Sequence, residues 1–126
     1  MAAYRHECKH EINTSDFITL SMRLNAALKA DEFARADGAY EITSLYFDDV
    51  YGTALKEKIS GVNCRDKFRL RRYNNDTEHI KLEKKSKRGG FCLKESAAIT
   101  STQAQSIIGG DIDFLAAQGG VMAELY

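Results

Sequence analysis

The sequence has little of what membrane insertion, secretion or a cysteine-bound metal requires. No apolar run approaches the roughly 18 residues of a membrane-spanning helix, so we expect no direct membrane insertion. The first residues, MAAYRHECKHE, lack the apolar segment of a signal peptide. The three cysteines are an odd number without CxxC spacing, which argues against a disulfide framework and a structural zinc site. A reducing, cytoplasmic compartment is the simplest interpretation.

Proline and net charge are absent as well. We have no physical account of the lack of proline. The 18 Lys and Arg balance the 18 Asp and Glu, which excludes a uniformly basic nucleic-acid binder. The balance is uneven along the chain, because residues 65–94 hold 11 of the Lys and Arg but only 4 of the Asp and Glu, a local net charge of +7. This distribution favours a basic groove or interior inside an otherwise acidic shell.

Alternating residues and turn signals predict five strands, and helical periodicity predicts helices between and after them. Strands are expected at residues 4–12, 39–49, 64–73, 78–86 and 90–97. Helices are expected at 15–29 and 51–60, followed by two short helices after residue 100. The apolar stripe of the helix at 15–29 should lie on a core. This order predicts one α+β domain in which antiparallel pairing dominates and helices pack outside the sheet.

The segment CRDKFRLRRYN, residues 64–74, places four cations on one face of a strand. Four like charges in a row repel each other unless an anion lies over them. Three other segments show the same charged alternation. The charged sets are Arg5/Glu7/Lys9/Glu11, Arg65/Lys67/Arg69/Arg71, Lys81/Glu83/Lys85/Lys87 and, more weakly, Lys94.

If these faces converge, they would form a polar and mainly cationic surface. Guanidinium and ammonium groups match phosphate oxygens, and isolated carboxylates can hold the divalent metal that accompanies triphosphates. A single basic strand is more often a solvated face, but a small domain cannot easily turn every charged face outward. The opposite faces are apolar enough to meet helices. Asp48 and Asp49 are interpreted as a strand-ending turn or an N-cap of the following helix, and less readily as metal ligands.

Four segments together carry a resemblance to a known family. They are YRHECKHEI, SLYFDD, ALKEKISGVNCRDKFRLRRYN and IKLEKKSKRGG followed by LKESAAIT. In order and spacing they resemble bacterial members of the VTC domain, the polyphosphate polymerase domain of the triphosphate tunnel metalloenzyme superfamily. One departure is Thr43, which stands where the family frequently has arginine.

The resemblance implies an antiparallel tunnel of about eight strands with helices outside. Five predicted strands make about half of it, so we expect residues 1–126 to be the N-terminal part of a truncated domain that is inactive alone. The family transfers the γ-phosphoryl group of ATP to polyphosphate with Mn²⁺ or Mg²⁺. The implied catalytic residues are Arg69, Arg71 and Lys85. The implied phosphate-binding residues are Arg5, Lys9, Lys67, Arg69, Arg71, Lys81, Lys85 and Lys94, and Glu7 and Glu83 are the candidate metal ligands.

Three alternatives stay open. The chain could be a triphosphate hydrolase of the same fold, a non-catalytic module that binds polyphosphate, RNA or another polyanion, or a structural remnant. The basic face of residues 65–71 has no aromatic residue before Tyr73. Single-strand nucleic-acid binders interleave aromatic residues with cations, so phosphate recognition is favoured over specific nucleic-acid binding. Open strand edges predict association with a second copy of the chain.

Overall fold

The computed structural model describes residues 3–32 and 34–126 and divides the chain into two compact units. One unit comprises the residues up to 7 together with residues 41–126, and it contains the whole sheet. The other unit, residues 8–40, contains α1 (Thr14–Ala27). Its helix begins with a capping box, in which the Asn13 side chain and Asp16 each accept a hydrogen bond from the other's backbone.

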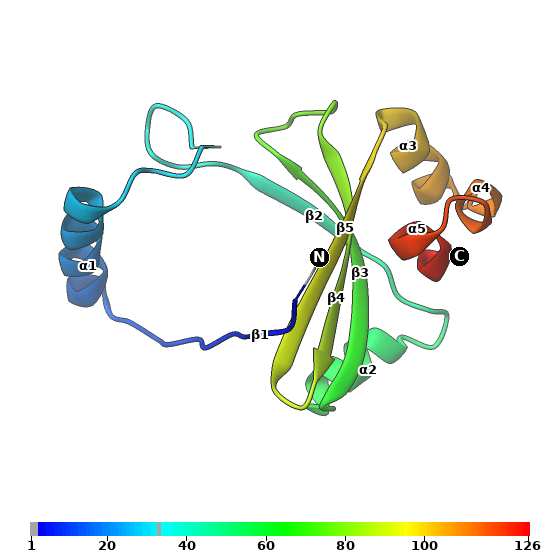
Figure 1. Cartoon of the computed structure of the whole chain (residues 1–126), viewed down its shortest axis with the longest axis horizontal. Helices are drawn as coiled ribbons and strands as arrows, with labels where there is room; N and C mark the ends of the chain where they lie inside the picture. The colour runs from blue at the N-terminus through cyan, green and yellow to red at the C-terminus, as the bar shows by residue number, and fades with distance from the viewer. Residues whose placement is uncertain (1–2, 33) are drawn as a thin grey trace. The chain divides into compact units, whose positions relative to one another are not determined.

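The sheet of the larger unit is antiparallel and open, with the strand order β1-β5-β4-β3-β2 (Figure 1). Its strands are β1 (Arg5–His6), β2 (Ile42–Tyr46), β3 (Cys64–Tyr73), β4 (Ile80–Arg88) and β5 (Phe91–Ile99). The helices of this unit are α2 (Thr53–Ile59), α3 (Ser101–Gly109), α4 (Asp113–Ala116) and α5 (Gly120–Leu125). The fold is therefore α+β with a partial, barrel-like sheet, as predicted.

The turn chemistry positions these strands. Gly89 and Gly90 have φ values of +55° and +91°, which allow the tight turn of the β4–β5 hairpin. Asn74 and Asn75 adopt positive φ after β3, a conformation that asparagine tolerates better than most residues. The Asn74 side chain also accepts a hydrogen bond from the backbone of Glu41 at 3.0 Å, joining this turn to the chain just before β2.

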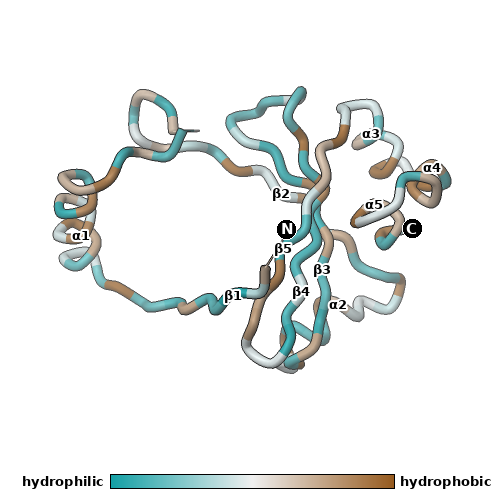
Figure 2. The backbone as a smooth tube through the Cα atoms, viewed as in Figure 1, coloured by the Kyte–Doolittle hydropathy of each residue, from teal (hydrophilic) through white to brown (hydrophobic). Residues whose placement is uncertain are grey.

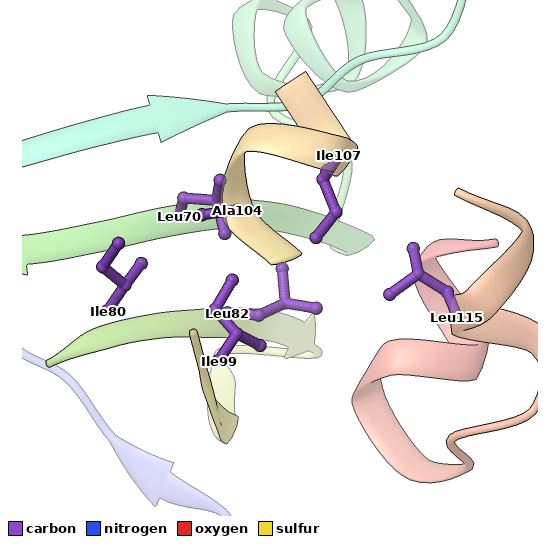
Figure 3. Packing of buried hydrophobic residues seen from close by; sticks show 7 residues of the cluster. All are labelled: Leu70, Ile80, Leu82, Ile99, Ala104, Ile107 and Leu115. Atoms are coloured by element: carbon purple, nitrogen blue, oxygen red, sulfur yellow. The ribbon is translucent and has the colours of Figure 1, made fainter. Parts of the chain in front are cut away.

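The core lies on one face of the sheet, under the C-terminal helices (Figure 3). The buried cluster consists of Leu70, Ile80, Leu82, Ile99, Ala104, Ile107 and Leu115. Leu82 and Leu115 are fully buried, and burying a side chain of this size contributes about 1.5–3 kcal/mol. The helices predicted to lie outside the sheet therefore cover its apolar face.

Two predicted elements differ from the structure. The helix at 15–29 is present as α1, but none of its residues is buried, so its apolar stripe does not form a core in the described structure. The region after residue 100 forms three helices and not two, because Gly110 caps the end of α3 and Gly119 precedes the start of α5, both with positive φ.

The strand predicted at residues 4–12 is the largest correction. Only Arg5 and His6 pair with β5, opposite Cys92 and Phe91. Because the strands are antiparallel, the next residue, Glu7, comes opposite the glycine turn, where β5 has not yet begun. Alternation indicates two faces, but a strand also needs a neighbour for its backbone hydrogen bonds.

Candidate functional site

The strand register collects the charged side chains on the face opposite the core. Residues directly opposite each other in an antiparallel pair project to the same face. The pairing of β3, β4 and β5 therefore builds cross-strand rows: Arg71–Lys81–Ala98, Arg69–Glu83–Ser96, Lys67–Lys85–Lys94 and Arg65–Lys87–Cys92. Arg5 joins the last row by pairing with Cys92. We call this surface the charged face. Figure 2 shows hydrophilic residues along β3 and β4. The alternate residues of these two strands, Leu70, Ile80 and Leu82, point to the other face and belong to the core.

Lys67, Lys85 and Lys94 form a row of three cations in register on three neighbouring strands. Like charges placed directly opposite each other destabilise a sheet. Each lysine has a compensating neighbour. Lys85 forms an ion pair with Glu7, and the Lys94 Nζ lies 3.5 Å from Glu83 Oε1. The Lys67 Nζ lies 5.3 Å from the centre of the Tyr46 ring, within range of a cation–π contact.

Arg69 lies at the centre of the charged face and is held from two sides. Its Nε and Nη2 atoms lie 2.8 and 2.6 Å from Oε2 of Glu83. Its Nη1 donates to the Tyr46 hydroxyl at 2.9 Å. The Arg69 side chain is only 14% exposed and that of Glu83 only 2%, so this pair is largely removed from water. A charge pair this buried persists only when hydrogen bonds satisfy it.

Arg71 is held less completely. Its Nε donates to Ser44 Oγ at 3.1 Å, and its guanidinium carbon lies 6.0 Å from the centre of the Tyr73 ring. The hydroxyl and the ring together orient the Arg71 guanidinium. The guanidinium is thus held in place while its charge stays available to an anion.

The electrostatics of the face follow from burial and the crowd of cations. Burial raises the pKa of Glu83, but the hydrogen bond from Arg69 and the charges of Arg69, Lys94 and Arg71 outweigh it and lower that pKa. Burial, with the charges of Lys85 and Arg69, lowers the pKa of Lys67. Burial also raises the pKa of Tyr46, but the hydrogen bond from Arg69 and the charges of Arg69, Lys67 and Arg71 outweigh burial and lower that pKa. The cations of the face thus contribute to all three pKa shifts.

The structure brings most of the predicted phosphate-binding residues together. Those on the charged face are Arg5, Lys67, Arg69, Arg71, Lys81, Lys85 and Lys94. Lys9 is the exception, since it follows the two-residue β1 and belongs to the unit of residues 8–40. Its predicted place on a sheet strand was wrong for the same reason as the strand itself: the chain leaves the edge of β5 after His6.

Both carboxylates expected to bind a metal contact cations of the charged face. Glu83 has its two oxygens directed to Arg69 and Lys94, and Glu7 is paired with Lys85. Within residues 3–32 and 34–126, no group of three or more His, Cys, Asp or Glu side chains is arranged to hold a metal ion. Carboxylates surrounded by cations suit ion pairing better than Mn²⁺ or Mg²⁺, so Glu7 and Glu83 do not fit that role in this arrangement.

Two contributors to the face were missed by sequence reasoning. Tyr46 and Ser44 come from β2 and lie opposite Arg69 and Arg71. The signal is the alternation of SLYFDD, a segment without Lys or Arg, so a pattern of cations does not reveal it. The N-cap of α2 is Gly52 and not one of the two aspartates. Both aspartates nevertheless satisfy the start of this helix: Asp48 accepts from the backbone N–H groups of Ala54 and Leu55 at 2.8 and 3.0 Å, and Asp49 accepts from that of Thr53 at 2.9 Å.

The fold and the face define an α+β domain with a cationic sheet surface suited to anions. A family model, the VTC domain, matches residues 4–125, and the chain belongs to that family. No curated protein matches the chain in sequence. Among the described residues, no helix has the length and apolar character needed to cross a bilayer.

Proposed function

We propose that the charged face binds the phosphates of ATP and of polyphosphate, as part of a polyphosphate polymerase that transfers the γ-phosphoryl group to the polyphosphate end. The observation that carries this proposal is the lysine row Lys67–Lys85–Lys94 beside Arg69 and Arg71. A row of cations in register is unfavourable by itself, and a polyanion over it would add ionic contacts to those that Glu7 and Glu83 supply. Membership of the VTC domain family supports polyphosphate as that polyanion.

The proposed chemistry rests on positioning and charge neutralisation. Phosphoryl transfer proceeds through a loose transition state whose charge is spread over the equatorial oxygens. Arg69, Arg71 and Lys85 would donate hydrogen bonds to those oxygens, and the remaining cations would hold the chain in line. The terminal phosphate of the acceptor is the nucleophile, so no side chain needs to form a covalent intermediate. Mn²⁺ or Mg²⁺ is the cofactor that the family suggests for this transfer.

The sheet in the described residues is open, and a tunnel needs a second wall. We therefore assign phosphate binding to this chain and place catalysis in a closed tunnel of which this sheet would form one side. The same surface would also serve a triphosphate hydrolase. The two reactions differ in product, because a polymerase lengthens polyphosphate while a hydrolase releases orthophosphate from tripolyphosphate.

The experiment is to incubate the natural protein with ATP and Mn²⁺ and to stain the products for polyphosphate. The proposal expects polyphosphate from the wild type and none from a folded Arg69→Ala/Arg71→Ala variant. A double variant that keeps full activity would contradict the assignment of this strand. Release of orthophosphate from tripolyphosphate without chain growth would favour the hydrolase.

A non-catalytic polyanion-binding module is the second candidate. Tyr46 and Tyr73 add aromatic rings to the charged face, which RNA bases could stack on. The Tyr46 ring, however, already contacts Lys67 and Arg69, at 5.3 and 5.7 Å. Competition separates the candidates: a phosphate site releases oligouridylate when tripolyphosphate is added, whereas an RNA site retains it.

A further inference from the structure

Glu83 differs from every other residue of the charged face because it is an acid at its centre, almost fully buried. In register it lies between Arg69 and Ser96, one row from Lys67–Lys85–Lys94 and one row from Arg71–Lys81. An uncompensated carboxylate at this position would repel the phosphates that the face is proposed to bind. Its contacts show what it does instead: both oxygens are directed to cations of the same face.

The hydrogen bonds of Arg69 show what the buried carboxylate of Glu83 does. A guanidinium has five N–H donors in a planar fork. Glu83 accepts from the Nε side of Arg69, at 2.8 Å to Nε and 2.6 Å to Nη2, and Tyr46 accepts from Nη1 at 2.9 Å. The donors that remain for a ligand are the second N–H groups of Nη1 and Nη2. The plane and direction of the fork are thereby fixed before any ligand arrives.

We propose that Glu83 and Tyr46 are positioning residues that lock the guanidinium of Arg69 in the orientation that receives phosphate. This inference rests on the proposed phosphate-binding function and goes beyond it by giving the buried acid a role through Arg69. An oriented donor needs no reorganisation when phosphate binds, whereas a free arginine side chain would lose its freedom at that moment. Lys94, 3.5 Å from the other Glu83 oxygen, is anchored by the same carboxylate.

The proposal separates two kinds of arginine on one strand. Glu83 neutralises much of the charge of Arg69, so Arg69 contributes directed hydrogen bonds more than attraction. Arg71, held by the neutral Ser44 hydroxyl, keeps its charge. Removing Glu83 should therefore have two opposite effects: it adds net positive charge to the face, and it frees Arg69. If Glu83 is a positioning residue, the loss of Arg69 orientation outweighs the added positive charge, and phosphate binding weakens.

The test is a calorimetric titration of the 126-residue chain with tripolyphosphate in the presence of EDTA. EDTA removes divalent metal, so a metal ligand and a positioning residue give different results. The variants are Glu83→Gln and Tyr46→Phe. The matched control is Glu95→Gln, which removes a carboxylate from β5 on the opposite face of the sheet, opposite Lys84. Circular dichroism and thermal unfolding report whether each variant is folded.

We expect Glu83→Gln to weaken tripolyphosphate binding about tenfold and Tyr46→Phe about threefold, with no change in the control. In an Arg69→Ala background Tyr46→Phe should have no further effect, because its hydroxyl acts through Arg69. Glu83→Gln should no longer weaken binding in that background, because the carboxylate left without Arg69 repels phosphate. Equal or tighter binding by Glu83→Gln would overturn the proposal. An equal loss with and without Arg69 would also overturn it, since it would indicate a general structural role.

Failure of the wild type to bind and failure of Glu83→Gln to fold have different meanings. A wild-type chain that does not bind tripolyphosphate contradicts the proposed function itself, before any variant is compared. If Glu83→Gln does not fold, Tyr46→Phe decides alone, because Tyr46 is half exposed and its hydroxyl can be removed without opening the core. Unchanged binding by that variant, with a normal unfolding temperature, would then overturn the positioning role.

Discussion

At the scale of single residues, the charged face depends on how each cation is held more than on how many there are. Arg69 and Arg71 are two residues apart on β3 and project to the same face, yet Arg69 is clamped by an acid and a phenol while Arg71 meets a hydroxyl. The sequence predicted both as phosphate-facing but could not distinguish them. Their partners lie on β2 and β4, so only the register reveals them.

Arg71→Lys tests whether the fork of Arg71, and not its charge alone, is used. Lysine keeps the charge but loses the planar set of donors that matches phosphate oxygens. We expect tripolyphosphate affinity to fall about tenfold in a calorimetric titration. Arg72→Lys is the matched control, because Arg72 projects to the other face of the sheet, opposite Thr43. Equal affinities for the wild type and Arg71→Lys would show that charge is sufficient.

The buried pair also predicts how stability depends on pH. Burial raises the pKa of Glu83, but Arg69, Lys94 and Arg71 lower it below the unfolded value of about 4.3. A carboxyl with a depressed folded pKa contributes stability above the unfolded pKa, and that contribution is lost as the pH falls through the folded value. Thermal unfolding followed from pH 7 downward should therefore show an acid-induced loss below about pH 4.3. The loss should be smaller in Glu83→Gln; an equal loss would contradict this account.

At the scale of elements, turn signals and alternation predicted β3, β4 and β5 well, because the two faces of these strands have different environments. One face meets α3, α4 and α5, and the other carries the charges. The same reasoning failed for residues 7–12, whose alternation is equally clear. Beside these residues β5 has given way to the turn at Gly89 and Gly90, so their backbone has no strand of this sheet edge to pair with.

Two adjacent isoleucines in α3 test whether this helix covers the apolar face as described. Ile107 is 6% exposed and belongs to the core, while Ile108 is 62% exposed. Truncating a buried isoleucine to alanine costs about 2–5 kcal/mol, whereas an exposed position usually changes stability by less than about 0.5 kcal/mol. Urea unfolding of Ile107→Ala and Ile108→Ala should show this difference. Similar losses for both variants would mean that α3 packs through another face.

At the scale of the whole molecule, the sheet is open and its edges differ. β1 pairs with only two residues of β5, and β2 forms the opposite edge. The α+β class and the shared charged face were predictable from sequence, since strand alternation fixes which residues lie on one side. The position of Lys9, the extent of β1 and the roles of Tyr46 and Ser44 were not, because they depend on where neighbouring strands begin and end.

Open edges predict that the chain associates with itself. Unpaired backbone groups along an edge strand can pair with a second copy. We expect the sedimentation coefficient in analytical ultracentrifugation to rise with protein concentration. A coefficient that stays at the monomer value over the whole accessible concentration range would contradict this expectation.

The central claim, that the charged face binds a phosphate chain, is tested most directly by titrating tripolyphosphate into Lys85→Gln/Lys94→Gln. Arg23→Gln/Lys29→Gln is the control, because it removes two exposed cations outside the sheet. The account predicts that the lysine-row variant loses affinity about a hundredfold and that the control changes by less than about twofold. Equal losses in both variants would contradict the claim, since they would show that only net charge matters.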